Sequence, residues 1–336
     1  MSSTAAAPQV SGPKPPWHQS EWFRANVQTI SIALVLAIVV LFFANFATAF
    51  LTSGNVLNIL RQVAPLLIVA VAMTFVITTA GIDLSVGSIV GLTAALGADL
   101  LARGVNPVVM MVAMLALGAI VGVVNGFFTA YQRLPAFIVT LASLTAVRGI
   151  ALAITQGESI PIDPDRWFVT LGQGRILGIP NPVWIAIPVA ILGWLVLTRT
   201  RFGNYVVGIG SNEEAVRRAG VDTRKVLLSV YVLSGVMAAV AGLLFAARLS
   251  SGSSNAGAGL ELQVIAAVVL GGTSLFGGQG SIVGTMLGAL TIAVIGNGLI
   301  LMQVSTFYVQ IVQGVVLLLA IYANARLFSR FTKGRR

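Results

Sequence analysis

The side chains that most often carry out chemistry are nearly missing from this sequence. The chain has no cysteine and a single histidine, His18, so it offers no thiol nucleophile, no thiolate metal site and no Ser/His/Asp arrangement in its apolar part. The phosphate-binding motif Gly-x-x-x-x-Gly-Lys-Ser/Thr is also absent. The sequence therefore predicts that the chain is not an enzyme, has no catalytic residues, and binds no metal or cofactor of its own.

Two ionisable residues interrupt long apolar segments, where a charge is costly and usually functional if the segment crosses a membrane. Asp83 can cap the apolar segment that follows it by accepting a backbone N–H, or it can contact a solute. Arg148 can reach towards the membrane surface, form a structural pair, or line a cavity. Two further acids, Asp99 and Glu261, lie near the ends of apolar segments, where we expect them to face water.

Uncharged polar residues in the apolar segments can hydrogen-bond a neutral polyol, or they can hold helices together. We select Asn125, Arg148 and Asn297 as the possible pathway residues. The remaining uncharged candidates are Thr140, Ser143, Gln310 and Gln313.

The elements that must position these residues are membrane-spanning helices. The chain is 57% hydrophobic and only 9% charged, whereas a soluble domain has about 25% charged residues. A transmembrane helix needs about 20 mostly apolar residues, which predicts an all-α integral membrane protein with about ten such helices. The predicted spans are 27–51, 62–82, 84–101, 106–129, 135–155, 182–198, 226–247 and three more within 262–325, separated by breaks at 276–280 and 302–305.

Basic residues indicate how the spans are oriented. They concentrate in the loop 199–225 and at the end of the chain, and such segments stay in the cytoplasm. We predict a disordered cytoplasmic tail over 1–26, a transmembrane domain over 27–325 and a basic cytoplasmic tail over 326–336. We therefore explain the net charge of +10 by basic residues that orient the membrane helices, and not by nucleic-acid binding.

The loop 199–225 is the most charged segment, and a short helix is predicted within it at 211–219. Ser211 or Asn212 can form its N-cap, and Gly220 can end it. Acidic residues in its first turn and basic residues in its last turn suit the helix dipole. These residues are Glu213, Glu214, Arg217 and Arg218. A plain surface helix that caps a loop has the same features.

Glycine patterns predict close helix contacts and an imperfect internal repeat. The pentapeptide GSIVG occurs at 87–91 and at 280–284, and Asn-Gly occurs at 125–126 and at 297–298. Many transporters consist of two repeats, although these residues are also common in membrane spans generally. Small residues four apart let helix backbones approach. The two predicted faces are Gly118, Gly122 and Gly126, and Gly280, Gly284 and Gly288.

Three segments together resemble the permease subunits of ATP-driven (ABC) importers for ribose, xylose, arabinose and galactose. They are GIDLSVG at 81–87, AAVVLGGTSLFGG at 266–278 followed closely by GSIVG at 280–284, and GSNEEA at 210–215 followed by Ala219 and Gly220. The resemblance extends from about residue 55 to residue 325. The residues that carry the membrane part of it are Gly81, Asp83, Ser85, Gly87, Gly271, Gly272 and Thr273.

This resemblance implies a multi-pass protein of the bacterial inner membrane, with two permease copies that form a homodimer. Two ATPase subunits would bind ATP and magnesium beneath them, and a periplasmic sugar-binding protein would deliver the substrate and set most of the selectivity. The inner loop also resembles the coupling signature Glu-Ala-Ala…Gly, with Val216 in place of the second alanine. The resemblance therefore implies that the residues that couple this chain to the ATPase are Glu213, Glu214, Ala215, Arg217, Arg218 and Gly220.

The sequence therefore predicts the permease of an importer for a pentose or a hexose. The nearest alternative is a related permease for a nucleoside, a polyol, a signalling furanose or a branched-chain amino acid. A secondary transporter is less favoured because the spans contain no series of carboxylates for an ion or a proton.

Overall fold

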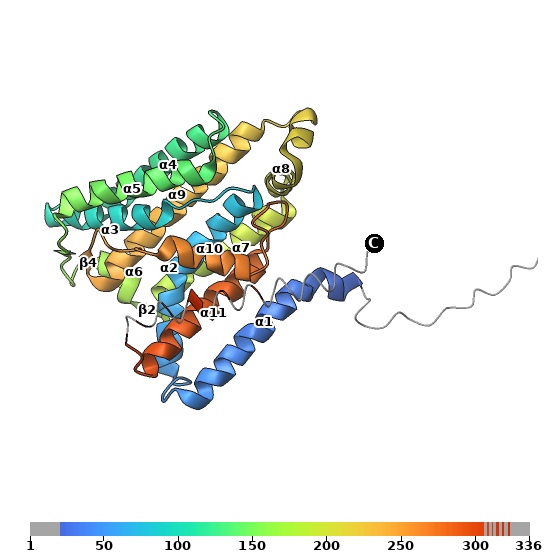
Figure 1. Cartoon of the computed structure of the whole chain (residues 1–336). Helices are drawn as coiled ribbons and strands as arrows, with labels where there is room; N and C mark the ends of the chain where they lie inside the picture. The colour runs from blue at the N-terminus through green and yellow to red at the C-terminus, as the bar shows by residue number, and fades with distance from the viewer. Residues whose placement is uncertain are drawn as a thin grey trace, which may run out of the picture.

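The computed structural model describes residues 21–305 and the single positions 308, 311, 314, 315, 318 and 322, with side chains from residue 29 onward. Within these residues the chain forms a bundle of helices joined by short connections (Figure 1). The helices are α1 (Glu21–Phe46), α2 (Ser53–Thr78), α3 (Val86–Ala102), α4 (Pro107–Ala130), α5 (Ala136–Thr155), α6 (Trp167–Gln173), α7 (Asn181–Arg199), α8 (Arg201–Arg218), α9 (Thr223–Leu249), α10 (Leu260–Leu270) and α11 (Ile282–Leu301).

Seven of the described helices, α1, α2, α4, α5, α7, α9 and α11, are long and apolar enough to cross a membrane. Two more apolar helices are shorter, with 17 residues in α3 and 11 in α10. At 1.5 Å per residue they span about 26 Å and about 17 Å, against a hydrocarbon core of about 30 Å. The all-α membrane class is confirmed and the count of ten is approximate: nine predicted spans coincide with these nine helices, and the tenth falls mostly on residues outside the described part.

Two predicted helix boundaries were wrong. The second span was predicted over 62–82, but α2 begins at Ser53, after Thr52 caps it by accepting from the N–H of Asn55 (3.4 Å). Arg61 therefore lies within a helix and not in a loop. At its other end α2 stops at Thr78, and Ala80 takes a positive φ of 61°. The chain then continues through a buried, irregular segment, residues 79–85, before α3 starts.

The connection between the predicted spans 135–155 and 182–198 has more structure than expected, and the predicted break at 276–280 is longer than expected. The loop contains α6 and three short strands, β1 (Ile160–Pro161), β2 (Arg175–Ile176) and β3 (Ile179–Pro180). β2 pairs with β3, and β1 pairs antiparallel with β4 (Ser251–Gly252), which follows α9. The break between α10 and α11 covers 271–281, and the predicted break at 302–305 is confirmed because α11 ends at Leu301.

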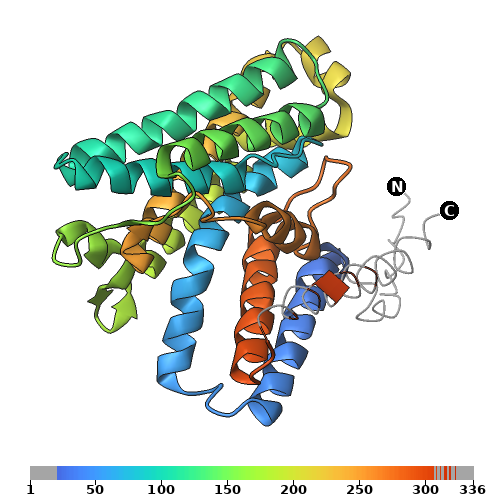
Figure 2. The same cartoon turned by 60° about the vertical axis from the view of Figure 1, so that its left-hand side comes forward.

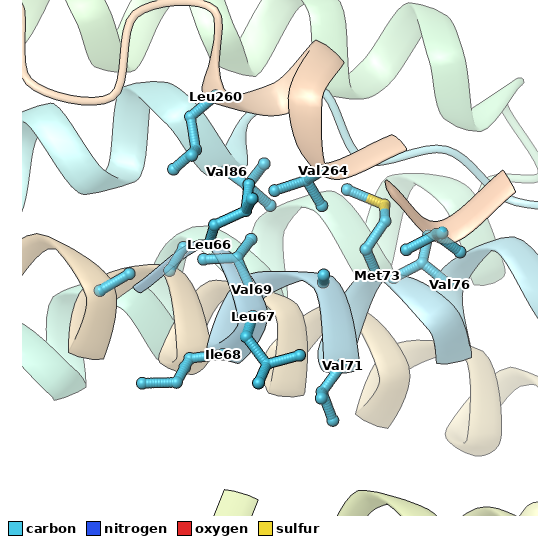
Figure 3. Close-up of a cluster of buried hydrophobic side chains, with 14 of the residues drawn as sticks. Leu66, Leu67, Ile68, Val69, Val71, Met73, Val76, Val86, Leu260 and Val264 are labelled. Carbon is cyan, nitrogen blue, oxygen red and sulfur yellow. The ribbon is translucent and has the colours of Figure 1, made fainter. Parts of the chain in front are cut away.

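The core is built around α2, whose side chains are buried almost without interruption from Val63 to Thr78. A helix that is apolar on all sides must be surrounded by other helices, and α2 packs against α7, α9, α10 and α11. Figure 3 shows its side chains together with Val86 of α3 and with Leu260 and Val264 of α10. Elements far apart in the sequence therefore meet on α2.

Glycine contacts join two pairs of helices, as the small-residue pattern predicts. On α4, a Cβ at Gly122 would lie 2.5 Å from the carbonyl oxygen of Tyr231 on α9, so only glycine allows this approach. On α11, Gly284 lies against the backbone of Gly271, and Gly288 against Ala267. The third member of that face was wrongly placed: it is Gly280, which precedes α11 and lies against Thr78 instead.

The two copies of GSIVG occupy different registers at the starts of two helices. Gly87 is the second residue of α3, whereas Gly280 stands before the N-cap of α11, which is Ser281. The Asn-Gly pairs are more alike. Each asparagine hydrogen-bonds another element, and Gly298 lies against Phe43 as Gly126 does against Leu228. The similarity is therefore in how these pairs pack, and it does not extend to a common register.

Gly284→Leu is expected to destabilise the protein by about 3 kcal/mol or more, because a large side chain must separate α11 from Gly271. The matched control is Gly149→Leu on α5, where nothing lies within 4 Å of an added Cβ. Thermal unfolding of both variants in detergent, followed by size-exclusion chromatography, measures the difference. Equal melting temperatures for the two variants would show that α11 does not need this close contact.

Candidate functional site

Asp83 ties three elements together inside the bundle. Its side chain is 0% exposed. Oδ1 accepts from the backbone N–H (3.0 Å) and the hydroxyl (2.6 Å) of Ser85, and Oδ2 accepts from the hydroxyl of Ser234 on α9 (2.7 Å). Asn125 of α4 donates to the Ser85 hydroxyl at 2.9 Å. The capping alternative predicted for Asp83 thus fits the geometry, since the carboxylate holds the start of α3 against α9.

The segment 210–220 contains the predicted short helix with the predicted cap. α8 is two helical runs that meet at Asn212, where φ is −163° and ψ is 93°. The Asn212 Oδ1 accepts from the N–H of Ala215 (3.0 Å), and after Arg218 the chain turns at Gly220 with φ 86°. The first run, which begins at Arg201, was not predicted. Figure 1 shows α8 at the same end of the bundle as the connection between α4 and α5.

The charges of this short helix mostly bind one another. Glu214 accepts from Arg217 and, at 2.9 Å, from Arg218, while Glu213 accepts from the hydroxyl of Thr223 (2.9 Å). Next to it, Asp222 caps α9, and its side-chain hydrogen bond with Lys225 lowers the pKa of this exposed carboxyl. Exposed pairs of this kind add little stability each. Their effect is to hold the charged side chains in defined positions on the surface.

The short helix stands over unfilled space. A cavity of about 410 Å³ separates it from the irregular segment 79–85 and the adjacent ends of α4 and α9. Six of the lining residues are Gly81, Thr129, Arg133, Glu213, Arg217 and Tyr231. At Gly81 an added Cβ would lie 2.6 Å from the Tyr231 hydroxyl, so the absence of a side chain at this position leaves room for the tyrosine. The helix therefore has room to move towards the core.

On its other side, α8 is joined directly to α2 and to the loop 271–281. Gly278 donates its N–H to the carbonyl of Thr78 (2.9 Å), and Gly210 lies against both. A Cβ at Gly277 would lie 2.8 Å from the Gly210 carbonyl. We call these contacts the glycine joint. A shift of the first run of α8, before the kink at Asn212, would press directly on the end of α2, because no flexible side chain separates the backbones.

The remaining signature residues shape that loop. Gly271 lies against Gly284, Gly272 has a positive φ of 90°, and the Thr273 hydroxyl accepts from the N–H of Ser281 at 3.2 Å. Two motifs that are separate in the sequence, at 210–215 and at 266–278, therefore meet in space. The sequence analysis identified both motifs but did not predict that they are in contact. It also missed Ser234, which the sequence marks only as a polar residue within an apolar helix.

Of the possible pathway residues, the two asparagines hold helices together. Asn297 of α11 and Asn55 of α2 exchange two amide hydrogen bonds of 2.9 Å each. Asn125 is 0% exposed and bonds Ser85. Arg148 differs, because its Nη1 donates to the carbonyls of Ser254 and, at 3.1 Å, Ala256, in the chain between α9 and α10.

Glu261 was predicted to face water near the end of a span, and it is only partly exposed. It lies in the first turn of α10, beside Gly87 of α3. Its Oε2 is buried and has no hydrogen-bond partner among the described residues. A helix N-terminus favours a carboxylate in its first turn, which accounts for its place there but leaves one oxygen unsatisfied.

These elements define a membrane permease component. A family model described as "Branched-chain amino acid transport system / permease component" matches residues 55–321, and the chain belongs to this family. Its multi-pass helices accordingly place it in the bacterial inner membrane.

The individual proteins to which this chain is similar include sugar permeases. The ribose import permease protein RbsC of Escherichia coli (strain K12) is 44% identical over 309 residues, covering 90% of this chain and 94% of that protein. RbsC of Bacillus subtilis (strain 168) is 41% identical, covering 90% and 95%. The xylose transport system permease protein XylH of Haemophilus influenzae (strain ATCC 51907 / DSM 11121 / KW20 / Rd) is 34% identical, covering 89% and 96%. No solved structure shows a significant match. The resemblance predicted from the three motifs is confirmed.

Proposed function

We propose that this chain is the membrane subunit of an ABC importer that carries a monosaccharide, a pentose or a hexose, into the bacterial cell. The observation that carries the proposal is the similarity to ribose import permeases over about nine tenths of the chain. The family description names branched-chain amino acids, but the three relatives described above are named for ribose and xylose, which favours a sugar.

In this proposal the chain is not itself an enzyme, and energy comes from a separate ATPase subunit that binds ATP and magnesium. The short helix 213–218 is the docking element, because it is exposed, carries a fixed charge pattern and leads into the glycine joint. Phe276, at 92% exposed, lies in the loop of that joint and adds an apolar residue to the same surface. Closure of the ATPase would push α8 and so move α2 and the loop 271–281 together.

The other partners are a periplasmic sugar-binding protein, a second copy of this chain and the bilayer. Both termini and the α8 end of the bundle face the cytoplasm, since the basic residues concentrate there. A second copy would cover faces that one chain leaves open, and the passage would run between the two copies. The binding protein, which meets the sugar first, supplies most of the selectivity.

The test is reconstitution of the chain in liposomes with its cognate ABC ATPase and periplasmic sugar-binding protein. We expect one sugar from a panel of ribose, xylose, arabinose and galactose to stimulate ATP hydrolysis and to be taken up. Leucine and inositol are the matched controls for the alternative solutes. Uptake of leucine instead would show that the chain is a permease for amino acids. Uptake driven by an ion gradient without ATP would overturn the assignment to an ABC importer.

A further inference from the structure

The chain between α9 and α10 enters the bundle as a non-helical segment, in which the short strand β4 is followed by consecutive turns. Residues 252–257 run along α3, with Gly252 against Ala94 and Gly257 against Val90 and Gly87. Seven residues of helix separate Ala94 from Gly87, so the segment descends about 10 Å along α3. Figure 2 shows it passing between β4 and α10. Non-helical backbone at membrane depth persists only where protein or water satisfies it.

Two charged residues and two glycines hold this segment. Arg148 of α5 bonds its carbonyls, as described above, and Glu261 follows it at the start of α10. Gly87 and Gly91, one turn apart on α3, provide the space: a Cβ at Gly91 would lie 2.5 Å from the Ser254 carbonyl oxygen and 2.6 Å from the Arg148 Nη1. A Cβ at Gly87 would meet the Glu261 carboxylate. The arrangement therefore depends on one face of α3 having no side chains.

Hydrogen-bonding capacity is left over at this place. Glu261 Oε2 and Ser254 Oγ are buried, and neither has a partner among the described residues. Arg148 donates both of its hydrogen bonds through Nη1, and within the described residues no carboxylate lies within 4.0 Å of its guanidinium nitrogens. A buried carboxylate oxygen without a donor is costly, so this place holds polar groups that the described residues of the single chain do not satisfy.

The same place is open in the single chain. Asn255 and Thr145 are exposed, and Arg148 and Glu261 are partly exposed. Arginine, glutamate and backbone carbonyls at membrane depth do not face lipid, because each would cost several kcal/mol there. This face must therefore look onto water or onto a second copy, as the wall of a passage does.

We propose that Arg148, Glu261 and the segment 253–258 form a contact site for the hydroxyl groups of the transported monosaccharide. The inference rests on the proposed function. A carboxylate accepts from hydroxyl groups, a guanidinium donates to them, and the opposite charges balance, which suits a neutral polyol better than an ion. The site supplements the binding protein: that protein chooses which sugar arrives, and the contact site acts on the sugar during passage.

The test uses the complete reconstituted complex and a series of monodeoxy analogues of its sugar. Glu261→Gln is expected to lower uptake of the parent sugar about tenfold or more, since a hydrogen bond to a charged group is lost. For the analogue that lacks the contacted hydroxyl, the same substitution should change uptake less than twofold. Glu158→Gln, an exposed acid after α5, is the control and should leave uptake of every analogue unchanged.

Asn255→Ala provides a second variant that removes only an exposed side chain and does not disturb the core. It should show the same dependence on one hydroxyl if Glu261→Gln fails to fold. Losses that are equal for all analogues in both variants would mean that these residues only clamp the backbone, and would overturn the contact site. Absence of sugar uptake by the unaltered complex would instead contradict the proposed function.

Discussion

Asp83→Leu is expected to abolish the folded permease, whereas Asp83→Asn is expected to leave most of it intact. Leucine removes the acceptor for the N–H and the hydroxyl of Ser85 and for the hydroxyl of Ser234, all inside a 0% exposed site. Each buried group left without a partner costs about 1–3 kcal/mol. The sum is comparable to the whole stability of a typical domain, about 5–15 kcal/mol.

Asparagine is the matched control because it has nearly the same shape. Its Oδ1 can still accept both bonds from Ser85, and its amide can donate to the Ser234 oxygen, since a hydroxyl both donates and accepts. Yield and thermal stability of both variants in detergent, with uptake in liposomes, give the comparison. An Asp83→Asn protein that is stable but takes up no sugar would show that the negative charge has a role in transport beyond holding α3 to α9.

The second large effect is expected from Glu214→Lys, which should lower the sugar transported per ATP at least tenfold while the protein remains folded. In the native chain Glu214 binds Arg217 and Arg218. A lysine at this position puts three positive charges at spacings of three and four residues on one helical turn, where like charges repel. It also reverses the charge that the ATPase would meet, and charge complementarity fixes how two surfaces align.

The fold should survive because these side chains are about half exposed or more, and exposed pairs contribute little to stability. The measurement is uptake and ATP hydrolysis in the same liposomes, together with co-purification of the ATPase. Glu158→Lys makes the same charge change after α5, far from α8 in the sequence, and should have no effect. A Glu214→Lys complex with the normal ratio of sugar to ATP would remove the short helix from the coupling route.

The glycine joint gives this coupling a physical path. Close backbone contacts transmit displacement because they cannot be absorbed by rotation of side chains. Gly210, Gly278 and Thr78 make such contacts, and the cavity on the opposite side of the short helix leaves it free to move. A rigid connection on one side and open space on the other is the arrangement that a lever needs.

The sequence by itself determined the elements that depend on a few neighbouring residues. Apolar length predicted nine of the described membrane helices, and side-chain capping by Asn212 with a turn at Gly220 predicted the short helix. Glycines spaced by four predicted that one face of α4 makes a close helix contact, and the structure identifies its partner as α9. These features follow from composition and local geometry, because a membrane demands apolar helices and a helix end demands a cap.

Only the tertiary structure decided how the buried polar groups are paired. Asp83 binds Ser234, 151 residues away, and Arg148 binds Ser254, 106 residues away. The early end of α2 and the non-helical segment 252–257 were likewise not foreseen. The physical reason is that a polar group inside the membrane must find a partner, and the choice of partner depends on which distant helices pack together. Local signals end at a helix boundary, whereas this pairing is settled by the whole bundle.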